Sequence, residues 1–352
     1  MIEGAVEVCK ALEALLKQAN IKGKIKDVIS LSAGGNNRIY EIKTSSGSFA
    51  AKKYFRHEYD QRDRLATEYA FANYAADVAP KFVSRPYACI YEEGWALYDY
   101  LEGIHIGPND INKQHVDQAI NFFKALNNTS SRLTITDKPL PNASEACFTI
   151  QEHLDLVKNR IFKLQQSPAI KSFQNNIAIE FLEKLNEFWV AISAEIAEKA
   201  KEYNILNRSL DRNQRCISPS DFGFHNALLQ SNGQIKFIDF EYAGIDDPAK
   251  MAGDFFAQLA VPIPTEYFNE FVHETMYAFE KPNTLIIRAK LMRLVYKVKW
   301  CCIAMNVFLP INLTRRKFAN PFLDEAKLKD IQLNKAVQFF NTFKQETING
   351  IH

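Results

Sequence analysis

Residues 218–241 read SPSDFGFHNALLQSNGQIKFIDFE, and this stretch decides the expected fold. Asn232-Gly233 separates two short apolar runs, which is the strongest local signal for a two-residue hairpin turn because both residue types tolerate positive φ. With that turn, the register of the hairpin places Asn226 opposite Asp239. Cross-strand neighbours have Cβ atoms about 4.5–5.5 Å apart, so these two side chains are expected together at the open end of the hairpin.

The residue types at this end of the hairpin indicate a magnesium site. An amide oxygen and a carboxylate with retained waters and phosphate groups are ligands that suit Mg²⁺, so Asn226 and Asp239 are the candidate metal ligands. Asp221 lies in the loop that leads into the same end, from which its carboxylate is expected to reach a hydroxyl attacking a metal-bound phosphate. The structural alternative is that Asp221 and Asn226 cap a turn and that Asp239 ends a strand.

The spacing matches the D-x-x-x-x-N loop and the later metal-binding Asp of kinases. Residues 218–241 resemble the catalytic region of the aminoglycoside phosphotransferase and choline kinase family, whose fold is protein-kinase-like. The resemblance implies that Asp221 is the catalytic Asp, that Asn226 is a metal ligand and that Asp239 is the principal metal ligand. The Asp247-Pro248 pair that follows is similar to the family's downstream pattern.

A candidate phosphate-binding loop lies earlier in the chain, between two predicted strands. Residues 32–37 read Ser-Ala-Gly-Gly-Asn-Asn, and Gly34 and Gly35 let backbone N–H groups approach phosphates without side-chain obstruction. Asn36 and Asn37 complete this loop. A Gly-Gly turn that joins two strands is more often a simple hairpin, so the interpretation depends on the sequence around it.

The strand after this loop contains the candidate lysine. Phe49-Ala-Ala-Lys52 resembles the V-A-I-K strand of kinases. Strand alternation puts Ala50 and Lys52 on one face, where the small Ala leaves room for adenine and the ammonium group reaches the α- and β-phosphates. Lys53 points the other way and is the alternative if this parity is wrong. Without the surrounding motifs, the favoured interpretation of Lys52 would be a solvent-exposed lysine on an edge strand.

The family resemblance implies two further positions in the nucleotide site. Glu68 lies sixteen residues after Lys52 in the next predicted helix, where the family has a Glu that holds this lysine by an ion pair. Glu58 is the alternative, and an isolated helical Glu is usually a surface residue. Residues 98–103 resemble the connector between lobes whose backbone hydrogen-bonds the base, which makes Tyr100 a candidate nucleotide contact.

Hydrophobic periodicity changes character near residue 102. The strands predicted before it are 28–32, 39–44, 48–54, 82–91 and 95–101, with a helix over 57–76. The rest is mainly helical apart from the hairpin. With the resemblance, this pattern implies an α+β, protein-kinase-like two-lobed fold. Residues 1–101 are expected to form a nucleotide-binding lobe with a small antiparallel sheet and one helix, and 102–352 a larger, mainly helical catalytic and substrate-binding lobe.

Composition is typical of a folded protein, with 352 residues, 47% of them hydrophobic, and a formal net charge of +2. No basic run indicates a nucleic-acid partner, and no stretch approaches the roughly 20 apolar residues that cross a bilayer. The six cysteines lack the C-x-x-C spacing of zinc or redox sites. The N-terminal segment has helical periodicity in place of an export signal, so we expect a cytoplasmic protein without a membrane partner.

The resemblance implies an ATP-dependent phosphotransferase that uses Mg²⁺, with GTP as the alternative donor, and transfers the γ-phosphoryl group to a small-molecule hydroxyl. Residues 104–206 and the C-terminal helices are where the family builds acceptor pockets. Glu241, Asp246 and Asp247 suggest a cationic acceptor such as an aminoglycoside or choline, and a sugar-like acceptor stays open. The sequence does not indicate an oligomeric state.

Two features leave alternatives open. The family usually has His two residues before the catalytic Asp, where this chain has Pro219, and His225 does not replace it by position. This departure supports a pseudokinase that binds nucleotide without chemistry, whereas the intact set of one Lys, two Asp and one Asn opposes it. Trp189 and Trp300 could form an aromatic wall for a quaternary ammonium, although their apolar helical stripes favour core positions. A protein kinase is disfavoured because no A-P-E anchor follows the metal-binding Asp.

Overall fold

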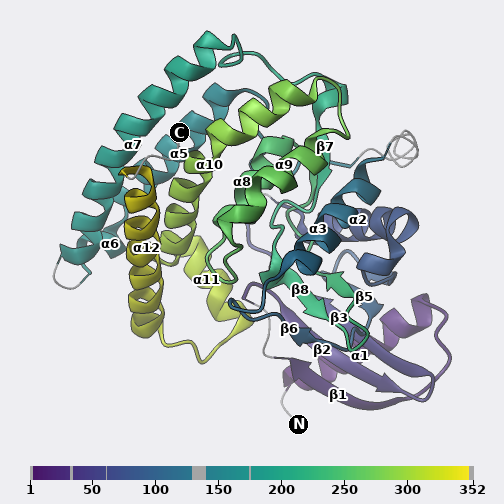
Figure 1. Cartoon of the computed structure of the whole chain (residues 1–352). Helices are drawn as coiled ribbons and strands as arrows, with labels where there is room; N and C mark the ends of the chain where they lie inside the picture. The colour runs from purple at the N-terminus through teal and green to yellow at the C-terminus, as the bar shows by residue number, and fades with distance from the viewer. Residues whose placement is uncertain (1–2, 32–34, 61, 129–139, 174–175, 349–352) are drawn as a thin grey trace.

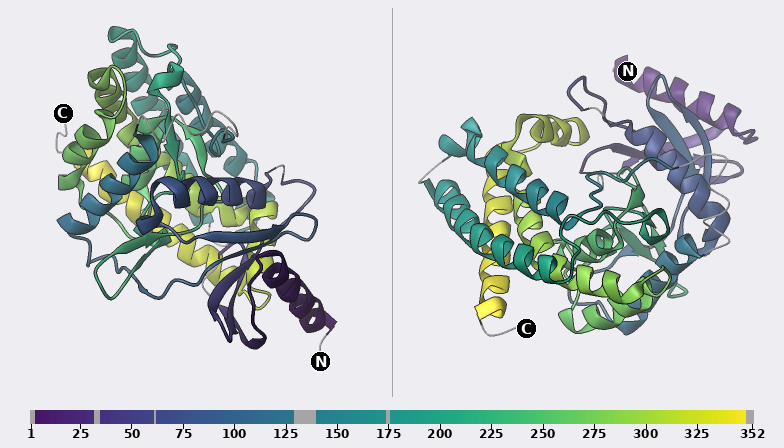
Figure 2. Two further views of the ribbon diagram at one scale, coloured as in Figure 1. Left: turned by 90° about the vertical axis from the view of Figure 1, so that its right-hand side faces the viewer. Right: turned by 90° about the horizontal axis from the view of Figure 1, so that it is seen from above.

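The computed structural model describes residues 3–31, 35–60, 62–128, 140–173 and 176–348. A five-stranded antiparallel sheet in the order β1-β2-β3-β5-β4 forms one end of the molecule, and the long helices form the other (Figure 1, Figure 2). The strands are β1 (Ile25–Leu31), β2 (Arg38–Thr44), β3 (Gly47–Lys53), β4 (Pro86–Ile90), β5 (Trp95–Asp99), β6 (Ile104–His105), β7 (Cys216–Ser218), β8 (Ala227–Leu229), β9 (Ile235–Phe237) and β10 (Gly244–Asp246).

The second part of the chain is mainly helical, as the sequence predicts. The α-helices are α1 (Glu3–Gln18), α2 (Arg64–Val78), α3 (Lys113–Asn127), α5 (Ile150–Gln165), α6 (Pro168–Lys171), α7 (Ile177–Glu202), α8 (Pro248–Ala257), α9 (Phe268–Met276), α10 (Pro282–Ala304), α11 (Pro310–Ala319) and α12 (Glu325–Ile348). Two small sheets, β6-β8-β9 and β7-β10, lie among these helices. Strands β8 and β9 are the two arms of the hairpin within residues 218–241.

The two faces of the five-stranded sheet have different partners, because successive side chains of a strand alternate between faces. Phe49 and Ala51 of β3 lie in an apolar cluster with Leu12 of α1. Ala96 and Tyr98 of β5 lie in a second cluster with residues of α2. The face that holds α2 is the one that looks toward the helical lobe, so it supplies the site.

The largest differences from the predicted boundaries are at the starts of two elements. The helix expected over 57–76 begins at Arg64, because the Asp63 side chain accepts a hydrogen bond from Ala66 N and caps it. The strand expected over 82–91 begins at Pro86. Before it, residues 80–82 form a short 3₁₀ helix with Pro at its first position, where the missing N–H is not needed.

The hairpin has a three-residue loop, and the predicted two-residue turn is wrong. Gln230 N donates to Gln234 O at 2.9 Å, and Gly233 N donates to Gln230 O at 2.9 Å. Gly233 takes a φ of +80°, the left-handed residue that follows the turn in three-residue loops. The extra residue shifts the register by one, so that Ile238 N donates to Asn226 O and Asp239 lies one residue beyond this pair.

Aromatic packing fixes the hairpin to the helical lobe. The ring of Phe122 in α3 stacks on Phe237 of β9 with centroids 4.8 Å apart, and Phe222 packs on Phe255 of α8 at 4.7 Å. All four side chains are buried. Aromatic pairs at such separations contribute beyond the area that they bury, so the loop between β7 and β8 rests on a rigid base.

In the described part of the chain, no single helix has the length and apolar character to cross a membrane. One bent pair, 282–308 and 310–319, has the required length and composition, with a bend of 73° between its halves.

A buried ion pair anchors α8 beneath the site. Asp247 accepts a hydrogen bond from Ala249 N at 2.7 Å and so caps the helix, and its other oxygen lies 2.6 Å from Arg288 Nε and 2.9 Å from His153 Nε2. Burial alone raises the pKa of Asp247, but the charge of Arg288 and the hydrogen bond with His153 lower it to about 2.

We expect Asp247→Ala to lower the free energy of unfolding by about 3–5 kcal/mol, because it leaves Arg288 as an uncompensated buried charge. Urea unfolding followed by tryptophan fluorescence measures this loss. The matched control is Asp330→Ala on the exposed face of α12, which should change stability by less than about 0.5 kcal/mol. Similar stabilities for the two variants would contradict the anchoring role.

The lowered pKa of Asp247 also predicts how the stability of the fold changes in acid. A carboxyl whose folded pKa lies near 2, against an ordinary 3.8, stabilises the fold above the ordinary value. That contribution, on the order of 2 kcal/mol, is lost as the pH falls from about 4 to about 2. The wild-type protein should therefore lose more stability over this range than the Asp247→Ala variant does.

Candidate active site

Lys52 is a buried residue of β3 that links the sheet to the hairpin. Its Nζ is 2.7 Å from Glu68 Oε2 and 2.6 Å from Asp239 Oδ1. The two acidic residues come from α2 and from the end of the hairpin, so one ammonium joins both lobes. Lys53 points to the opposite face, where its Nζ lies 5.2 Å from the centre of the Trp95 ring. Burial alone lowers the pKa of Lys52, but the charges of Asp239 and Glu68 raise it by more. The net pKa lies above the ordinary value, so the group stays an ammonium.

Asp239 and Glu68 lie in a crowded acidic environment. Burial raises the pKa of Glu68 to about 7 although Lys52 opposes this. Burial also raises the pKa of Asp239, and the charges of Glu241 and Asp221 add to the rise. Asp239 is therefore within electrostatic reach of Asp221, and this pocket favours additional cations.

Asp221 and Asn226 are held together directly. Asn226 Nδ2 donates to the backbone oxygen of Asp221 at 3.0 Å and to Asp221 Oδ2 at 3.2 Å. The Asp221 side chain stays 30% exposed and so is open to a ligand. These contacts, with the hydrogen bond from Ile238 N to Asn226 O, place Asp221 and Asn226 at the open end of the hairpin, where Asp239 is the next residue after Ile238.

Two non-glycine residues near the open end of the hairpin have a positive φ. Ser220 and Asp239 both have a φ of +66°. At Ser220 the chain turns sharply, with Asp221 N donating to Pro219 O at 2.9 Å across three residues, as in a γ-turn. Such backbone strain persists where the surrounding structure holds it, and it concentrates at functional sites.

His225 contacts the candidate catalytic carboxylate, which sequence reasoning missed. Its Nε2 lies 3.2 Å from Asp221 Oδ1. Burial alone raises the pKa of Asp221, but the electrostatic and hydrogen-bond interactions with His225, and the hydrogen bond from Asn226, lower it below its ordinary value. The contact depends on the 3₁₀ turn over residues 224–226, which brings His225 back onto Asp221.

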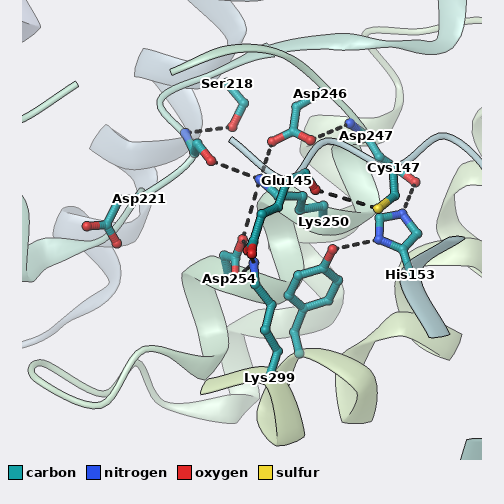
Figure 3. Close-up of polar contacts among 12 residues, drawn as sticks. Glu145, Cys147, His153, Ser218, Asp221, Asp246, Asp247, Lys250, Asp254 and Lys299 are labelled. Atoms are coloured by element: carbon teal, nitrogen blue, oxygen red, sulfur yellow. Dashed lines mark hydrogen bonds and ion pairs between the residues drawn. The ribbon is translucent and has the colours of Figure 1, made fainter. Parts of the chain in front are cut away.

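A buried lysine holds the loop that carries Pro219. Lys250 Nζ lies 2.8 Å from Ser220 Oγ and 2.5 Å from Asp246 Oδ2, and all of its side chain is buried (Figure 3). The residue just before Asp221 is thus tied to α8. This link positions the loop without the His that the resembled family usually has at position 219.

The glycine loop is tied to Glu241 by its asparagines. Asn36 Nδ2 and Asn37 Nδ2 donate to the two Glu241 carboxylate oxygens at 2.9 and 2.7 Å, and Arg64 Nη1 donates to the same carboxylate at 2.8 Å. Gly35 follows the residues that the structure leaves undescribed, and Gly34 lies among them. The two asparagine side chains therefore fix positions 36 and 37, and the backbone N–H groups of the loop stay the predicted phosphate donors.

The remaining candidate residues have separate positions. Tyr100 lies partly buried just after β5, in the segment that leads to the helical lobe. Trp189 is a core residue of α7. Trp300 of α10 is partly buried near the site, with Nε1 donating to Asp254 Oδ1 at 2.8 Å and its ring centre 6.1 Å from that of His225.

The carboxylates that suggested a cationic acceptor are already neutralised inside the protein. Glu241 pairs with Arg64, and the pairs of Asp246 and Asp247 described above are equally buried. Because Arg64, Lys250 and Arg288 already pair with these three carboxylates, they give no support for a cationic acceptor, and the acceptor's charge stays a prediction.

The donor set fits a magnesium ion that shares its ligands with a nucleotide. Among the described residues, no group of three or more His, Cys, Asp or Glu side chains forms a complete metal site. Asn226 uses Nδ2 toward Asp221, which leaves Oδ1 as a neutral oxygen ligand, and the carboxylate of Asp239 follows one residue after Ile238, the backbone partner of Asn226. Mg²⁺ is commonly held in this way, by one or two protein oxygens with water and substrate phosphates.

Known proteins share this architecture. A choline kinase from Cryptosporidium parvum superposes with a TM-score of 0.60 at 10% identity, over 97% of each chain. A spectinomycin phosphotransferase solved with ADP and spectinomycin has a TM-score of 0.57 at 13% identity, over 94% of this chain and 98% of its own. A choline kinase from Streptococcus pneumoniae has a TM-score of 0.55 at 16% identity, over 96% and 99%. These likenesses confirm the expected two-lobed, kinase-like α+β fold.

Sequence comparison assigns the family. The chain matches no curated protein sequence. The model of the phosphotransferase enzyme family, however, matches residues 27–275, which include the catalytic, nucleotide-binding and metal-binding residues predicted from the sequence. Since this match covers more than half of the 352 residues, the chain belongs to the phosphotransferase enzyme family.

Proposed function

We propose that this phosphotransferase moves the γ-phosphoryl group of ATP to a hydroxyl of a small molecule at the cleft between its lobes. The observation that carries the proposal is Lys52, whose ammonium joins Glu68 and Asp239 beside the Asp221–Asn226 pair. Phosphoryl transfer needs alignment and charge stabilisation more than covalent chemistry, and this arrangement can supply both.

Each residue has a role that its contacts support. Lys52 binds the α- and β-phosphates, and Glu68 holds its ammonium in place. Asp221, with a lowered pKa, orients the acceptor hydroxyl and takes its proton. The hydroxyl oxygen then bonds to the γ-phosphorus, and the bond from that phosphorus to the β–γ bridging oxygen breaks to release ADP. Asn226 and Asp239 would hold Mg²⁺, which would neutralise phosphate charge when bound.

The acceptor is proposed as a small hydroxyl compound. The solved relatives include choline kinases and a spectinomycin phosphotransferase, so choline, ethanolamine, aminoglycosides and common sugars are the first compounds to test. Because Glu241, Asp246 and Asp247 have internal partners, neutral acceptors belong in the panel on equal terms with cationic ones.

A coupled assay of ADP release over this panel tests the proposal. We expect Mg²⁺-dependent ADP release that rises with one acceptor class, and mass spectrometry should find a single added phosphoryl group on that acceptor. ATP and GTP in parallel define the donor. Nucleotide binding without ADP release for any acceptor would instead favour the pseudokinase alternative.

We predict that His225→Gln shifts the acidic limb of the kcat/KM profile to higher pH. His225 lowers the pKa of Asp221, so without it the carboxyl is protonated at a higher pH and the base is lost sooner on acidification. His273→Gln on the exposed surface of α9 is the control. A profile for His225→Gln that overlays the wild-type profile would contradict this role.

A further inference from the structure

A second cation from the helical lobe reaches the glycine loop. Arg316 lies in α11, and a Cβ atom placed on Gly35 would collide with its Nη1. Gly35 therefore leaves the space that the guanidinium occupies. Donors in a glycine loop of this kind face the phosphates of a nucleotide, so Arg316 lies where phosphate groups are expected.

Helix α11 is docked on the strand that follows this loop. Arg38, the first residue of β2, donates from Nε to Phe318 O at 2.9 Å, and its guanidinium carbon lies 4.6 Å from the centre of the Phe318 ring. The same ring packs edge-on against Phe55 with centroids 5.5 Å apart. Figure 1 shows α11 between the other C-terminal helices and the sheet. The position of Arg316 is thus set by contacts of its helix with the first lobe.

Arg316 also lacks a counter-ion of its own. Within the described ranges, no hydrogen bond or ion pair to its guanidinium is present. Burial and the neighbouring Arg315 lower the pKa of Arg316, while the charges of Tyr242, Asp221 and Glu241 act to raise it. Arg315 Nε is itself buried without a partner among the described residues. A partly buried guanidinium without a partner is stabilised by an anion.

The carboxylates of the site carry more negative charge than the neighbouring cations neutralise, so a further cation such as Arg316 is favourable there. Lys52 pairs with Glu68 and Asp239, and Arg64 pairs with Glu241 and Asp60, so these four carboxylates outnumber the two cations. Asp221 adds a further carboxylate, whose contact is with His225. A triphosphate adds further negative charge. Guanidinium groups bind phosphate through two parallel hydrogen bonds, and an arginine on the transferred phosphoryl group stabilises the charge that spreads over its oxygens.

We propose that Arg316 binds the terminal phosphoryl group of the donor nucleotide, so that α11 supplies a catalytic cation to the transfer site. This inference rests on the proposed function. Phe318 acts as the positioning residue, because its docking on Arg38 sets where the helix places Arg316.

Calorimetric titration with AMP-PNP and with ADP, each with Mg²⁺, tests the contact. For Arg316→Ala we expect AMP-PNP affinity to fall about ten- to hundredfold, the contribution of one charge-assisted contact, and ADP affinity to change less than about threefold. Arg316→Lys should recover only part of the loss, because an ammonium cannot bind in two-pronged fashion. The control Lys317→Ala changes the next residue of α11, which is exposed and pairs with Glu325, and should match the wild type.

The possible outcomes separate the inference from the proposed function. Equal losses for both nucleotides, or no loss for either, would overturn the role of Arg316 while the wild-type protein still binds nucleotide and releases ADP. A wild-type protein that binds neither nucleotide would overturn the proposed function and the inference with it. Phe318→Ala gives an independent check, since it should lower AMP-PNP affinity more than ADP affinity with Arg316 still present.

Discussion

Asp239→Asn is expected to lower turnover by about a thousandfold or more while the protein stays folded. The carboxylate is the charged partner of the proposed Mg²⁺, and a metal ion contributes several kcal/mol to stabilising a phosphoryl transition state. Asn suits the position structurally because it tolerates the φ of +66° found there. Lys52 keeps Glu68 as its partner in the variant, so the cleft retains one of its ion pairs.

Steady-state ADP release with the identified acceptor measures this loss, together with the Mg²⁺ concentration needed for half-maximal rate. Asp330→Asn, an exposed carboxylate on α12, removes the same charge far along the chain and should behave as the wild type. Turnover above about a tenth of the wild-type value in purified Asp239→Asn would rule out the metal assignment.

Asp221→Asn is expected to lower kcat by about 10²- to 10⁴-fold, which is the usual contribution of a positioned general base. The amide can still accept the hydrogen bond from Asn226, so the loop should keep its shape. Because Asp221 acts on the acceptor hydroxyl, nucleotide affinity should change less than about threefold. This distinguishes it from Asp239→Asn, which should weaken Mg²⁺-nucleotide binding as well.

Rapid-quench measurement of a single turnover, with calorimetry for nucleotide binding, checks both halves of this prediction. Asp330→Asn again serves as the control. A variant that loses nucleotide affinity and turnover in equal measure would show that Asp221 binds the donor and does not act on the acceptor.

The main features of the fold and the set of side chains in the cleft could be predicted from the sequence. Strand parity chose Lys52 over Lys53, and the family resemblance implied the ion pair between Lys52 and Glu68. These relations depend on local geometry, in which alternation and helix position carry most of the information. The roles of these residues in phosphoryl transfer stay predictions.

The hairpin register could not be predicted, because two- and three-residue loops share the same Asn-Gly signal. A slip of one residue ordinarily turns every side chain to the other face. Here Asp239 lies beyond the paired residues of β9 and takes a left-handed backbone, so its direction is set by that local conformation. The contact with Lys52 therefore exists although the predicted pairing does not.

Contacts between residues far apart in the chain could not be predicted from the sequence either. Arg316 is separated from Gly35 by most of the chain, and its helix has the mixed charged and apolar pattern of an ordinary surface helix. The partners of Asp246 and Asp247 depend on packing between α8 and its neighbours. For that reason the sequence reading assigned these carboxylates to the acceptor.

A crystal structure of the protein with Mg²⁺ and AMP-PNP tests the central claim most directly. The account predicts a metal ion that contacts Asn226 Oδ1, the Asp239 carboxylate and the phosphates, with Lys52 on the α- and β-phosphates and Asp221 facing the γ-phosphorus. A nucleotide bound outside the cleft, or a metal ion that touches neither Asn226 nor Asp239, would contradict it.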